Sequence, residues 1–433
     1  MAERKKRYVQ VGLGARSGIY TRALTQTYSE FAQLVGICDS NPGRMAFCNR
    51  RFSTEDRPIP TYPPEQFDRM IAEVSPDGVI VSSVDSTHAE YICRAMERGC
   101  DVITEKPMTI DAAGVRKILR TMKTTGKNVF VTFNARYAPA RTQIKELLAS
   151  HAVGEVLSVD FAWHLDTRHG ADYFRRWHRY RKSSGSLLVH KATHHFDLVN
   201  WWLDDVPEEV FAHGSLKFYT PRTGDRLGLQ GRTERCLTCP HQKSCPFFFD
   251  LTQDDGRKAM YLDCEGHDGY FRDRCVFAAD IDIWDSMSLS VRYRRGAVMS
   301  YLLHAYSPWE GYGIAFNGTA GKLEHHTRAQ GLETGLVPGE NRREQLSTVL
   351  SPLFGESRSI PVIEGEGGHG GGDPLLASDL FNPDAGPDPL GRKAGALAGA
   401  YSVLIGAAAC QSIDTGKAVR IDALLKDPPQ RED

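Results

Sequence analysis

The chain has 433 residues, more than a typical single domain, so we expect two domains. Hydrophobic residues make up 41% and charged residues 25% of it, which excludes wholesale disorder. With a net charge of −1, nothing favours nucleic acid or an anionic membrane over a small-molecule partner. The sequence carries neither a signal-peptide pattern nor an apolar run of about 18 residues, so we expect a cytoplasmic protein.

The first part of the chain alternates short apolar segments with helical ones. Five strands are predicted, at residues 8–14, 32–40, 77–84, 100–107 and 128–137. Four helices are predicted between them, at residues 19–30, 63–74, 88–99 and 111–126. Apolar strands that alternate with helices are typical of a parallel sheet covered on both faces. The pattern predicts an α/β fold with a doubly wound, Rossmann-type nucleotide-binding domain over residues 1–150.

Beyond residue 150 the pattern changes. Strand segments at 156–165, 286–293 and 297–306 alternate polar and apolar residues, as in an antiparallel sheet with one solvated face. We therefore expect a second domain over residues 151–433, with a Cys-rich insertion at about 233–275 and a final helix at about 391–413. Before this helix, the segment "EGEGGHGGGDPLL" holds His369 and Asp373 in either a plain glycine loop or a lid.

A glycine-rich loop, "VQVGLGARSG", follows the first predicted strand and precedes a helix. In such a loop the first glycine permits a tight turn, and the second lets a pyrophosphate approach the helix N-terminus. The residues expected to contact the cofactor here are Gly12, Gly14, Arg16, Ser17 and Gly18. The alternative is a turn without a ligand. Asp39 ends the next strand at the spacing of a carboxylate that binds the ribose hydroxyls, which favours NAD over NADP, although Arg44 lies nearby.

The strand at 100–107 ends in Glu105-Lys106-Pro107, at the sheet edge that lines the ligand crevice. Together with "VGLGARSG", "VIVSSVDSTH", "VTFNARYAP", "GEVLSVDF", "GSLLVHKATHHFDLVNWW" and "AFNGTAGKLE", this segment resembles the glucose–fructose oxidoreductase/inositol dehydrogenase (Gfo/Idh/MocA) family over nearly the whole chain. The resemblance implies an NAD(P)-dependent oxidoreductase of sugars, cyclitols or their derivatives. It also implies a C-terminal α/β domain with a large, mostly antiparallel open sheet, which often joins the subunits of a homo-oligomer, a dimer or a tetramer.

The resemblance further implies roles for single residues. Lys106 would lie between the nicotinamide and the substrate. The other cofactor contacts that it implies are Ser83, His88, Glu105, Asn134 and Arg136. The family pattern Asp-x-x-x-His-x-x-Asp stands here as His190-x-x-x-His194-x-x-Asp197, so His190, followed by Lys191, replaces an aspartate that helps to orient or deprotonate the substrate.

Residues 190, 194 and 197 are expected on one face of a helix. Oxidation of a carbinol needs a base that works near neutral pH, which suits histidine, and a lysine cation stabilises the developing alkoxide. We expect an acid–base cluster of Lys106, His190, Lys191 and His194, while the i, i+4 histidine pair leaves a metal site or a plain helix surface as alternatives. The candidate substrate contacts, besides this cluster, are Arg136, Trp163, His164, Tyr173, Arg176 and Trp177.

The Cys-rich insertion contains a CxxC knuckle and further cysteines. Cys236, Cys239, Cys245 and Cys275 fit a closed tetrahedral zinc site, with Cys264 as a competing fourth ligand. The segment has too few apolar residues for a core of its own, so a structural metal would stabilise it. An iron–sulfur cluster, reduced thiols and a local disulfide are the alternatives.

Three functions are consistent with these residues. The first is an NAD-dependent dehydrogenase that oxidises a hydroxyl of a sugar, glycoside or cyclitol, with Lys106 as the polarising group and His194, with His190, as the base. The second is a redox-assisted glycosidase or lyase that holds NAD tightly and eliminates the aglycone through a 3-keto intermediate, for which His190 and Lys191 supply a second acid–base pair. The third, a non-catalytic NAD-binding regulator, would be expected to lack Lys106 or His194.

Overall fold

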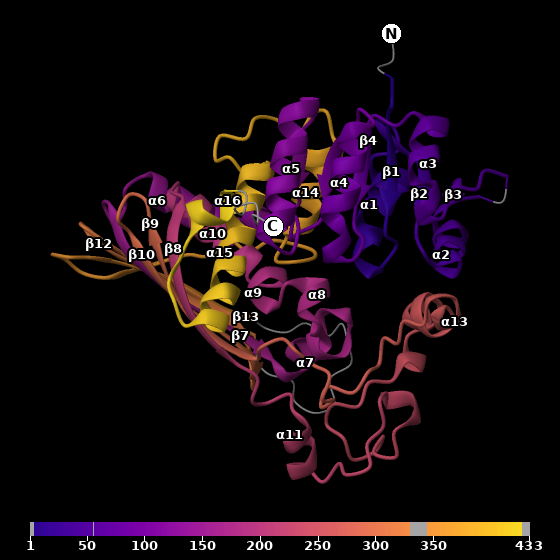
Figure 1. Ribbon diagram of the computed structural model, residues 1–433. Helices are drawn as coiled ribbons and strands as arrows, with labels where there is room; N and C mark the ends of the chain where they lie inside the picture. The colour runs from indigo at the N-terminus through magenta and orange to yellow at the C-terminus, as the bar shows by residue number, and fades with distance from the viewer. Residues whose placement is uncertain (1–3, 55, 330–343, 427–433) are drawn as a thin grey trace, which may run out of the picture. The chain divides into compact units, whose positions relative to one another are not determined.

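The computed structural model describes residues 4–54, 56–329 and 344–426, which form two compact units (Figure 1). The first unit contains Met1–Ala138 and two later segments, Asp250–Asp273 and Gly365–Val403. The second unit contains the intervening segments and the C-terminal part of the chain. The sequence places both later segments in the second domain. They join the first unit because their contacts with it, described below, connect residues more than 200 positions apart, which no local pattern indicates.

The first unit is built on a six-stranded parallel sheet in the order β3-β2-β1-β4-β5-β6. The strands are β1 (Lys6–Val11), β2 (Ala32–Cys38), β3 (Thr61–Tyr62), β4 (Gly78–Val81), β5 (Asp101–Thr104) and β6 (Val129–Val131). The strand order reverses between β1 and β4, and ligands of such sheets bind outside the carboxyl ends of the strands at this point. The predicted Rossmann-type sheet is confirmed.

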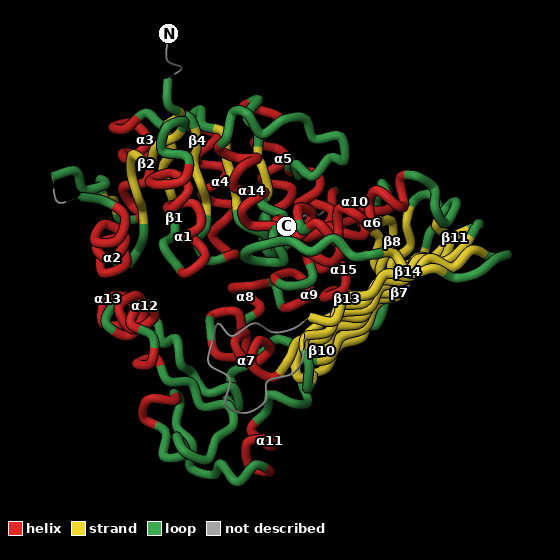
Figure 2. Tube along the Cα trace, turned by 180° about the vertical axis from the view of Figure 1, so that it is seen from behind, coloured by secondary structure: helices red, strands yellow, loops and turns green. Residues whose placement is uncertain are grey.

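Helices cover both faces of this sheet, as Figure 2 shows. They are α1 (Gly18–Arg22), α2 (Pro42–Phe52), α3 (Phe67–Val74), α4 (His88–Glu97), α5 (Ala112–Thr125) and, from a later segment, α14 (Gly372–Phe381). The first unit also contains α12 (Asp255–Arg257) and α13 (Glu265–Asp268), which belong to the segment Asp250–Asp273. Local signals set their ends. The side chain of Asp111 accepts a hydrogen bond from the backbone of Gly114 at the start of α5, and Gly126, with φ 69°, ends that helix in the left-handed conformation.

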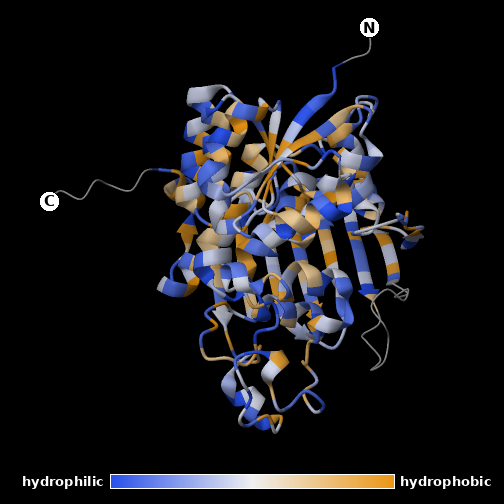
Figure 3. Cartoon of the chain, turned by 90° about the vertical axis from the view of Figure 1, so that its right-hand side faces the viewer, coloured by the Kyte–Doolittle hydropathy of each residue, from blue (hydrophilic) through white to orange (hydrophobic). Residues whose placement is uncertain are grey.

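The second unit contains a nine-stranded sheet in the order β14-β13-β12-β11-β7-β10-β9-β8-β15. Its strands are β7 (Val156–Asp166), β8 (Pro207–Ser215), β9 (Ser286–Tyr293), β10 (Val298–Ser307), β11 (Glu310–Gly318), β12 (Gly321–Ala329), β13 (Glu344–Pro352), β14 (Arg358–Ile360) and β15 (Val419–Arg420). Only the β7–β10 pair among the described strands of this sheet is parallel. Buried and exposed residues alternate along β9 and β10, and hydrophobic and hydrophilic residues alternate along the strands in Figure 3. The predicted one-sided, mostly antiparallel sheet is confirmed.

The helices of the second unit lie mainly between β7 and β8. They are α6 (Pro139–Ala149), α7 (Thr167–Arg175), α8 (Arg181–Ser184), α9 (Leu187–His190), α10 (Thr193–Leu203), α11 (Pro221–Arg226) and the C-terminal α16 (Ile421–Leu425). Helix α15 (Ala396–Thr415), predicted at about 391–413, is long and apolar enough to cross a membrane by length and composition alone, which corrects the expectation that the chain lacks an apolar run of about 18 residues. However, 67% of its most apolar window is buried within the protein, as in the core helix of a globular protein, so this is weak evidence for a membrane span.

Candidate active site

The glycine-rich loop after β1 is open where a cofactor would approach it. Gly12 has φ 84°, and a Cβ atom on it would lie 2.4 Å from the Cα of Ser83, so only glycine fits. A Cβ atom on Gly14, in contrast, would meet no described atom within 4 Å. The hydroxyl of Ser17 donates to the carbonyl oxygen of Gly14 (2.6 Å) and holds the turn. The second glycine therefore leaves space on the side where a pyrophosphate would lie, which fits a dinucleotide.

Asp39 directly follows β2, as expected for a ribose-binding carboxylate. One of its oxygens accepts from the backbone N–H of Leu13 (2.7 Å) and the other from that of Asn41 (2.8 Å). Burial raises the pKa of Asp39, and this effect exceeds the opposing effects of Arg44 and of the two amides. The carboxylate is thus fixed beside the glycine loop, and its remaining lone pairs can accept hydrogen bonds from ribose hydroxyls.

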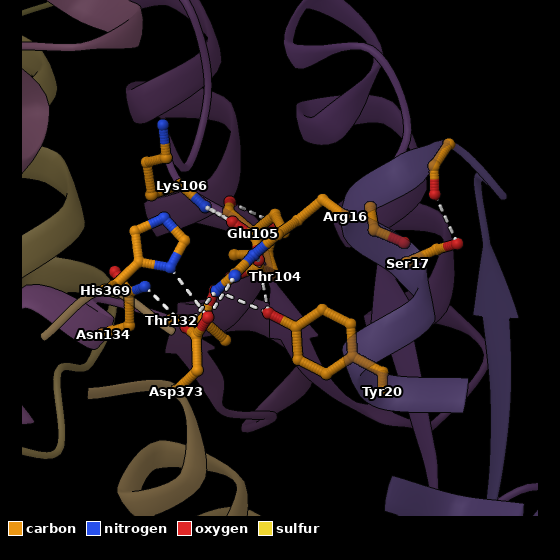
Figure 4. A network of polar contacts seen from close by, with 12 residues as sticks. Arg16, Ser17, Tyr20, Thr104, Glu105, Lys106, Thr132, Asn134, His369 and Asp373 are labelled. Carbon is orange, nitrogen blue, oxygen red and sulfur yellow. Dashed lines mark hydrogen bonds and ion pairs between the residues drawn. The ribbon is translucent and has the colours of Figure 1, made fainter. Parts of the chain in front are cut away.

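Arg16 of the glycine loop connects two carboxylates (Figure 4). Its Nε donates to Oε1 of Glu105 (2.6 Å), and its NH1 and NH2 atoms donate to the two carboxylate oxygens of Asp373, each at 3.0 Å. The Tyr20 hydroxyl also donates to Oε1 of Glu105 (2.5 Å). Burial alone would raise the pKa of Glu105, but the charge of Arg16 and the hydrogen bond from Tyr20 outweigh it and lower that pKa. Glu105 is therefore an ionised, buried anchor for Arg16.

Lys106 and Asn134 lie beside this network at the ends of β5 and β6. In Figure 4 the side chain of Lys106 points away from the carboxylates that Arg16 binds. The Asn134 amide donates to Oδ1 of Asp373 (2.7 Å), and the Nδ1 atom of His369 lies 2.7 Å from the other oxygen of Asp373. The glycine segment that the sequence left undecided thus brings both His369 and Asp373 to the residues expected to surround the nicotinamide.

The remaining cofactor candidates are held by the first unit in different ways. His88 is fully buried, and its two ring nitrogens face the carbonyl oxygens of Pro107 (2.8 Å) and Ser83 (3.1 Å). Burial lowers the pKa of His88 against the effect of these two carbonyls. Arg136 is buried as well and donates to the carbonyl oxygen of Gly391 (2.9 Å). His88 therefore fixes the backbone of two segments that border the crevice.

In the second unit, the histidine-rich segment is not one continuous helix. Helix α9 ends at His190, and α10 begins at Thr193, because the backbone N–H of Ala192 bonds to the carbonyl oxygen of Leu187, five residues earlier. His190 and His194 therefore belong to two helices, which corrects the expected single helical face. His190 is 9% exposed and His194 is half-buried.

Aromatic rings surround the histidines and Lys191. The ring of His190 lies 4.1 Å from that of His178 and 5.5 Å from that of Tyr173, between ring centroids. The ammonium group of Lys191 lies 5.0 Å from the centre of the Trp163 ring, a cation–π distance. Trp163 in turn stacks on Tyr312, with 4.7 Å between the ring centroids. Two of the predicted substrate contacts, Trp163 and Tyr173, thus lie next to the predicted acid–base residues of this unit.

Beside His190 lies a hydrogen-bonded chain that the sequence does not predict. The Nδ1 atom of His169 lies 2.9 Å from Oε1 of Glu310, and its Nε2 atom lies 2.9 Å from the hydroxyl of Tyr173. His169 and Tyr173 are separated by one helical turn of α7, a spacing visible in the sequence, but Glu310 begins β11, 141 residues later. A carboxylate that orients an imidazole, which in turn contacts a hydroxyl, is an arrangement typical of acid–base catalysis.

The four predicted zinc ligands, Cys236, Cys239, Cys245 and Cys275, line one cavity of about 20 Å³, the size of a single ion or water molecule. NH1 of Arg175 lies 3.6 Å from the Sγ atom of Cys236. Cys264 lies in the first unit, next to Gly43. Nevertheless, across residues 4–54, 56–329 and 344–426 no group of three or more His, Cys, Asp or Glu side chains is arranged to hold a metal ion, so the zinc prediction is not confirmed.

Two family domains match the chain. Residues 6–133 match the NAD-binding Rossmann fold of an oxidoreductase family, Gfo/Idh/MocA, and residues 145–421 match its C-terminal alpha/beta domain. The protein belongs to the Gfo/Idh/MocA family of oxidoreductases. The family resemblance of the sequence is confirmed, and with it an NAD-binding domain in the first unit.

The relatives of this protein carry names that describe different activities. YteT of Bacillus subtilis (strain 168) is 37% identical over 97% of this chain and 99% of its own. An inositol 2-dehydrogenase of Rhizobium meliloti (strain 1021) is 25% identical over 48% of this chain and 57% of its own. Glycosyl hydrolase family 109 protein 1 of Akkermansia muciniphila is 27% identical over 42% of this chain and 40% of its own. The relatives of this chain therefore include proteins named as an inositol dehydrogenase and as a glycosyl hydrolase.

Solved structures of other proteins have a similar fold. The WlbA dehydrogenase from Bordetella pertussis, in complex with NADH and UDP-GlcNAcA, has a TM-score of 0.63 at 16% identity, over 96% of this chain and 99% of its own. An aldose–aldose oxidoreductase from Caulobacter crescentus, complexed with glycerol, has a TM-score of 0.62 at 16% identity, over 96% of this chain and 100% of its own. At this identity the similarity shows the fold.

Proposed function

We propose that the protein is an NAD-dependent oxidoreductase that oxidises a hydroxyl group of a sugar, glycoside or cyclitol. The observation that carries the proposal is the network at the carboxyl edge of the Rossmann sheet, in which Arg16 of the glycine loop binds Glu105, the residue before Lys106. This contact fixes the segment that carries Lys106 relative to the phosphate-binding loop. Bound NAD⁺ supplies the hydride acceptor of such a reaction.

Each remaining group has a role that its chemistry suits. The Lys106 ammonium polarises the substrate oxygen and stabilises the alkoxide that forms as its proton leaves. His194, with His190, takes that proton, since imidazole exchanges protons near neutral pH. Lys191 and the Trp163 ring, 5.0 Å apart, form a cation–aromatic surface that suits the C–H face and the hydroxyls of a sugar ring.

A second candidate function is redox-neutral cleavage of a glycosidic bond, in which the hydride returns to the sugar after elimination and water addition. The hydrogen-bonded chain of Glu310, His169 and Tyr173 favours it. Elimination of an aglycone and addition of water need an acid–base group besides the one that serves hydride transfer. We assign this role to Tyr173, and its ring, 5.5 Å from that of His190, supports the assignment.

One experiment separates these functions. The purified protein is incubated with sugars, cyclitols and aryl glycosides, while NADH absorbance and released aglycone are recorded together. NADH formed in proportion to oxidised substrate supports the oxidoreductase, and aglycone release without net NADH supports the glycosidase. The Lys106→Met variant should lose at least 100-fold in kcat/KM in either case, whereas Lys123→Met, at an exposed lysine on α5, should not. Binding of NAD without any turnover would instead support a regulatory protein.

We also propose a structural zinc ion at Cys236, Cys239, Cys245 and Cys275. All four cysteines are among the residues that line one small cavity, and this part of the insertion contributes few residues to a hydrophobic core. Arg175, a buried cation beside the Cys236 sulfur, would stabilise a thiolate and would serve as the outer hydrogen-bond donor that zinc thiolates commonly have.

A further inference from the structure

Part of the Cys-rich insertion, Asp250–Asp273, packs against the dinucleotide-binding loops of the first unit. The hydroxyl oxygen of Tyr261 accepts a hydrogen bond from the backbone N–H of Ala15 in the glycine loop (3.1 Å). The carbonyl oxygen of Cys264 accepts one from the side-chain amide of Asn41, the residue that caps α2 (2.9 Å). The insertion is therefore attached both to the glycine loop and to the turn after β2.

The packing at this turn leaves little room for movement. A Cβ atom on Gly43 would lie 2.6 Å from the Sγ atom of Cys264 and 3.2 Å from the ring of His267. Tyr261 and Cys264 are both buried. Helix α13, which ends at Asp268, is thus held against the start of α2, the helix that carries Arg44.

Arg44 lies between two carboxylates. Its NH1 atom is 3.3 Å from Oδ1 of Asp39, and its NH2 atom is 2.5 Å from Oδ2 of Asp268. The side chain of Arg44 is 12% exposed, and its guanidinium lies 5.9 Å from the centre of the Tyr270 ring. Burial alone would lower the pKa of Arg44, but the charges of Asp39 and Asp268 outweigh it and raise that pKa. The guanidinium is therefore charged and bound on two sides.

An arginine shortly after β2 commonly accommodates the 2′-phosphate of NADP. Here one guanidinium faces two carboxylates, so the local charge is negative, and a phosphate dianion placed there would be repelled. In addition, a phosphate could bind Arg44 only by displacing Asp268. The 2′-hydroxyl of NAD carries no such charge and can donate to Asp39.

We propose that Asp268, contributed by the insertion, is a specificity-determining residue that makes the site select NAD over NADP by engaging Arg44. The inference rests on the proposed function, since it assumes a dinucleotide at the glycine loop. It assigns a role in cofactor selection to the segment Asp250–Asp273, which lies far along the chain from the Gly-x-Gly pattern and Asp39. Tyr261 supports it as a positioning residue, because its contact with Ala15 holds the insertion in place.

The test is the ratio of the dissociation constants of NADP⁺ and NAD⁺, measured by isothermal titration calorimetry on the full-length protein. Asp268→Asn keeps the shape of the side chain and removes its charge, and we expect the ratio to fall at least tenfold. Asp263→Asn is the matched control, since this carboxylate lies on the same segment but pairs with the exposed Lys258. Its ratio should equal that of the wild type. The double variant Asp268→Asn/Arg44→Gln should lose the gain in NADP⁺ binding.

Four results would overturn the inference. An unchanged ratio in a folded Asp268→Asn variant would show that Asp268 does not set the preference. A wild type that binds NADP⁺ more tightly than NAD⁺ would refute the predicted selection. If Asp268→Asn does not fold, Arg44→Gln decides: the ratio should change less than threefold, and a tenfold loss of NADP⁺ binding would mean that Arg44 already serves the 2′-phosphate. A folded wild type that binds neither dinucleotide would refute the proposed function as well.

Discussion

The guanidinium of Arg16 binds the carboxylate of Asp373 through two parallel hydrogen bonds of 3.0 Å, across 357 residues of sequence. Burial alone would raise the pKa of Asp373, but the hydrogen bonds from His369 and Arg16 outweigh it and hold that pKa well below its usual range. The contact attaches the start of α14, directly after the glycine-rich segment, to the phosphate-binding loop. It explains why a segment so late in the chain belongs to the first unit.

Asp373→Asn should lower the free energy of unfolding by about 1.5–3 kcal/mol at pH 7, because hydrogen bonds to a charged group are lost. The carboxyl binds its proton more weakly in the folded protein than in the unfolded chain, where its pKa is about 3.9. Its stabilising contribution is therefore present above that value and is lost as the pH falls from about 5. Denaturant unfolding at pH 7 and pH 3.5 should show a difference between wild type and variant that shrinks at the lower pH.

Asp384→Asn is the control for this prediction. Asp384 is exposed in the loop after α14, and its backbone N–H, not its carboxylate, donates a hydrogen bond to Asn382, so its variant should unfold like the wild type at both pH values. A loss of stability in Asp373→Asn that is equal at pH 7 and pH 3.5 would contradict the ionised state inferred for Asp373.

Substitution by alanine should have different effects on stability at Gly12 and at Gly14, the first two glycines of the phosphate-binding loop. Gly12→Ala should cost about 2 kcal/mol or more of stability, because φ is 84° and the new Cβ atom would lie 2.4 Å from the backbone of Ser83. Gly14→Ala should leave the stability within about 0.5 kcal/mol, since its Cβ atom meets no described atom within 4 Å. It should still weaken NAD⁺ binding about tenfold, because the methyl group occupies the space of the pyrophosphate. Equal affinity of Gly14→Ala and wild type would show that the pyrophosphate lies elsewhere.

Much of the fold could be predicted from the sequence because its signals are local. Apolar runs marked the parallel strands, the alternating pattern of β9 and β10 marked the one-sided sheet, and both sheets are confirmed. The packing of later segments of the chain against the first unit could not be predicted in this way. Two later segments join the first unit, Asp250–Asp273 and Gly365–Val403. They do so through individual long-range contacts, such as that between Tyr261 and Ala15, and such contacts produce no periodic pattern in the sequence.

The candidate site could be predicted where a motif carries the chemistry. Gly12, Asp39 and Lys106 follow strand ends, and the edge of a parallel sheet collects such residues. The partners of these motifs were missed, because Asp268 and Glu310 are ordinary surface-type residues in the sequence and acquire a role only through folding. The sequence thus predicts the residues that would contact ligands, but not the residues that hold these side chains in position.

His169→Asn should separate a catalytic role of the Glu310–His169–Tyr173 chain from a structural one. Asparagine cannot bridge the carboxylate and the phenol as imidazole does, so kcat should fall at least tenfold, with KM changed less than threefold and the affinity for NAD⁺ unchanged. His151→Asn, at an exposed histidine with φ 56° that asparagine tolerates, is the matched control and should retain full activity. A variant with unchanged kcat would exclude the chain from the reaction.

Zinc content tests the assignment of the cysteines. We expect about one zinc ion per chain in protein purified without chelator, measured by inductively coupled plasma mass spectrometry. Cys239→Ser should lose this zinc and several degrees of melting temperature, because a serine hydroxyl is a poor substitute for a thiolate ligand. Cys264→Ser should retain the metal, since Cys264 lies in the first unit beside Gly43, whereas Cys236, Cys239, Cys245 and Cys275 line one cavity in the second. If the wild-type protein contains no metal and melts at the same temperature with and without added zinc, the cavity holds reduced thiols, and Arg175 alone stabilises them.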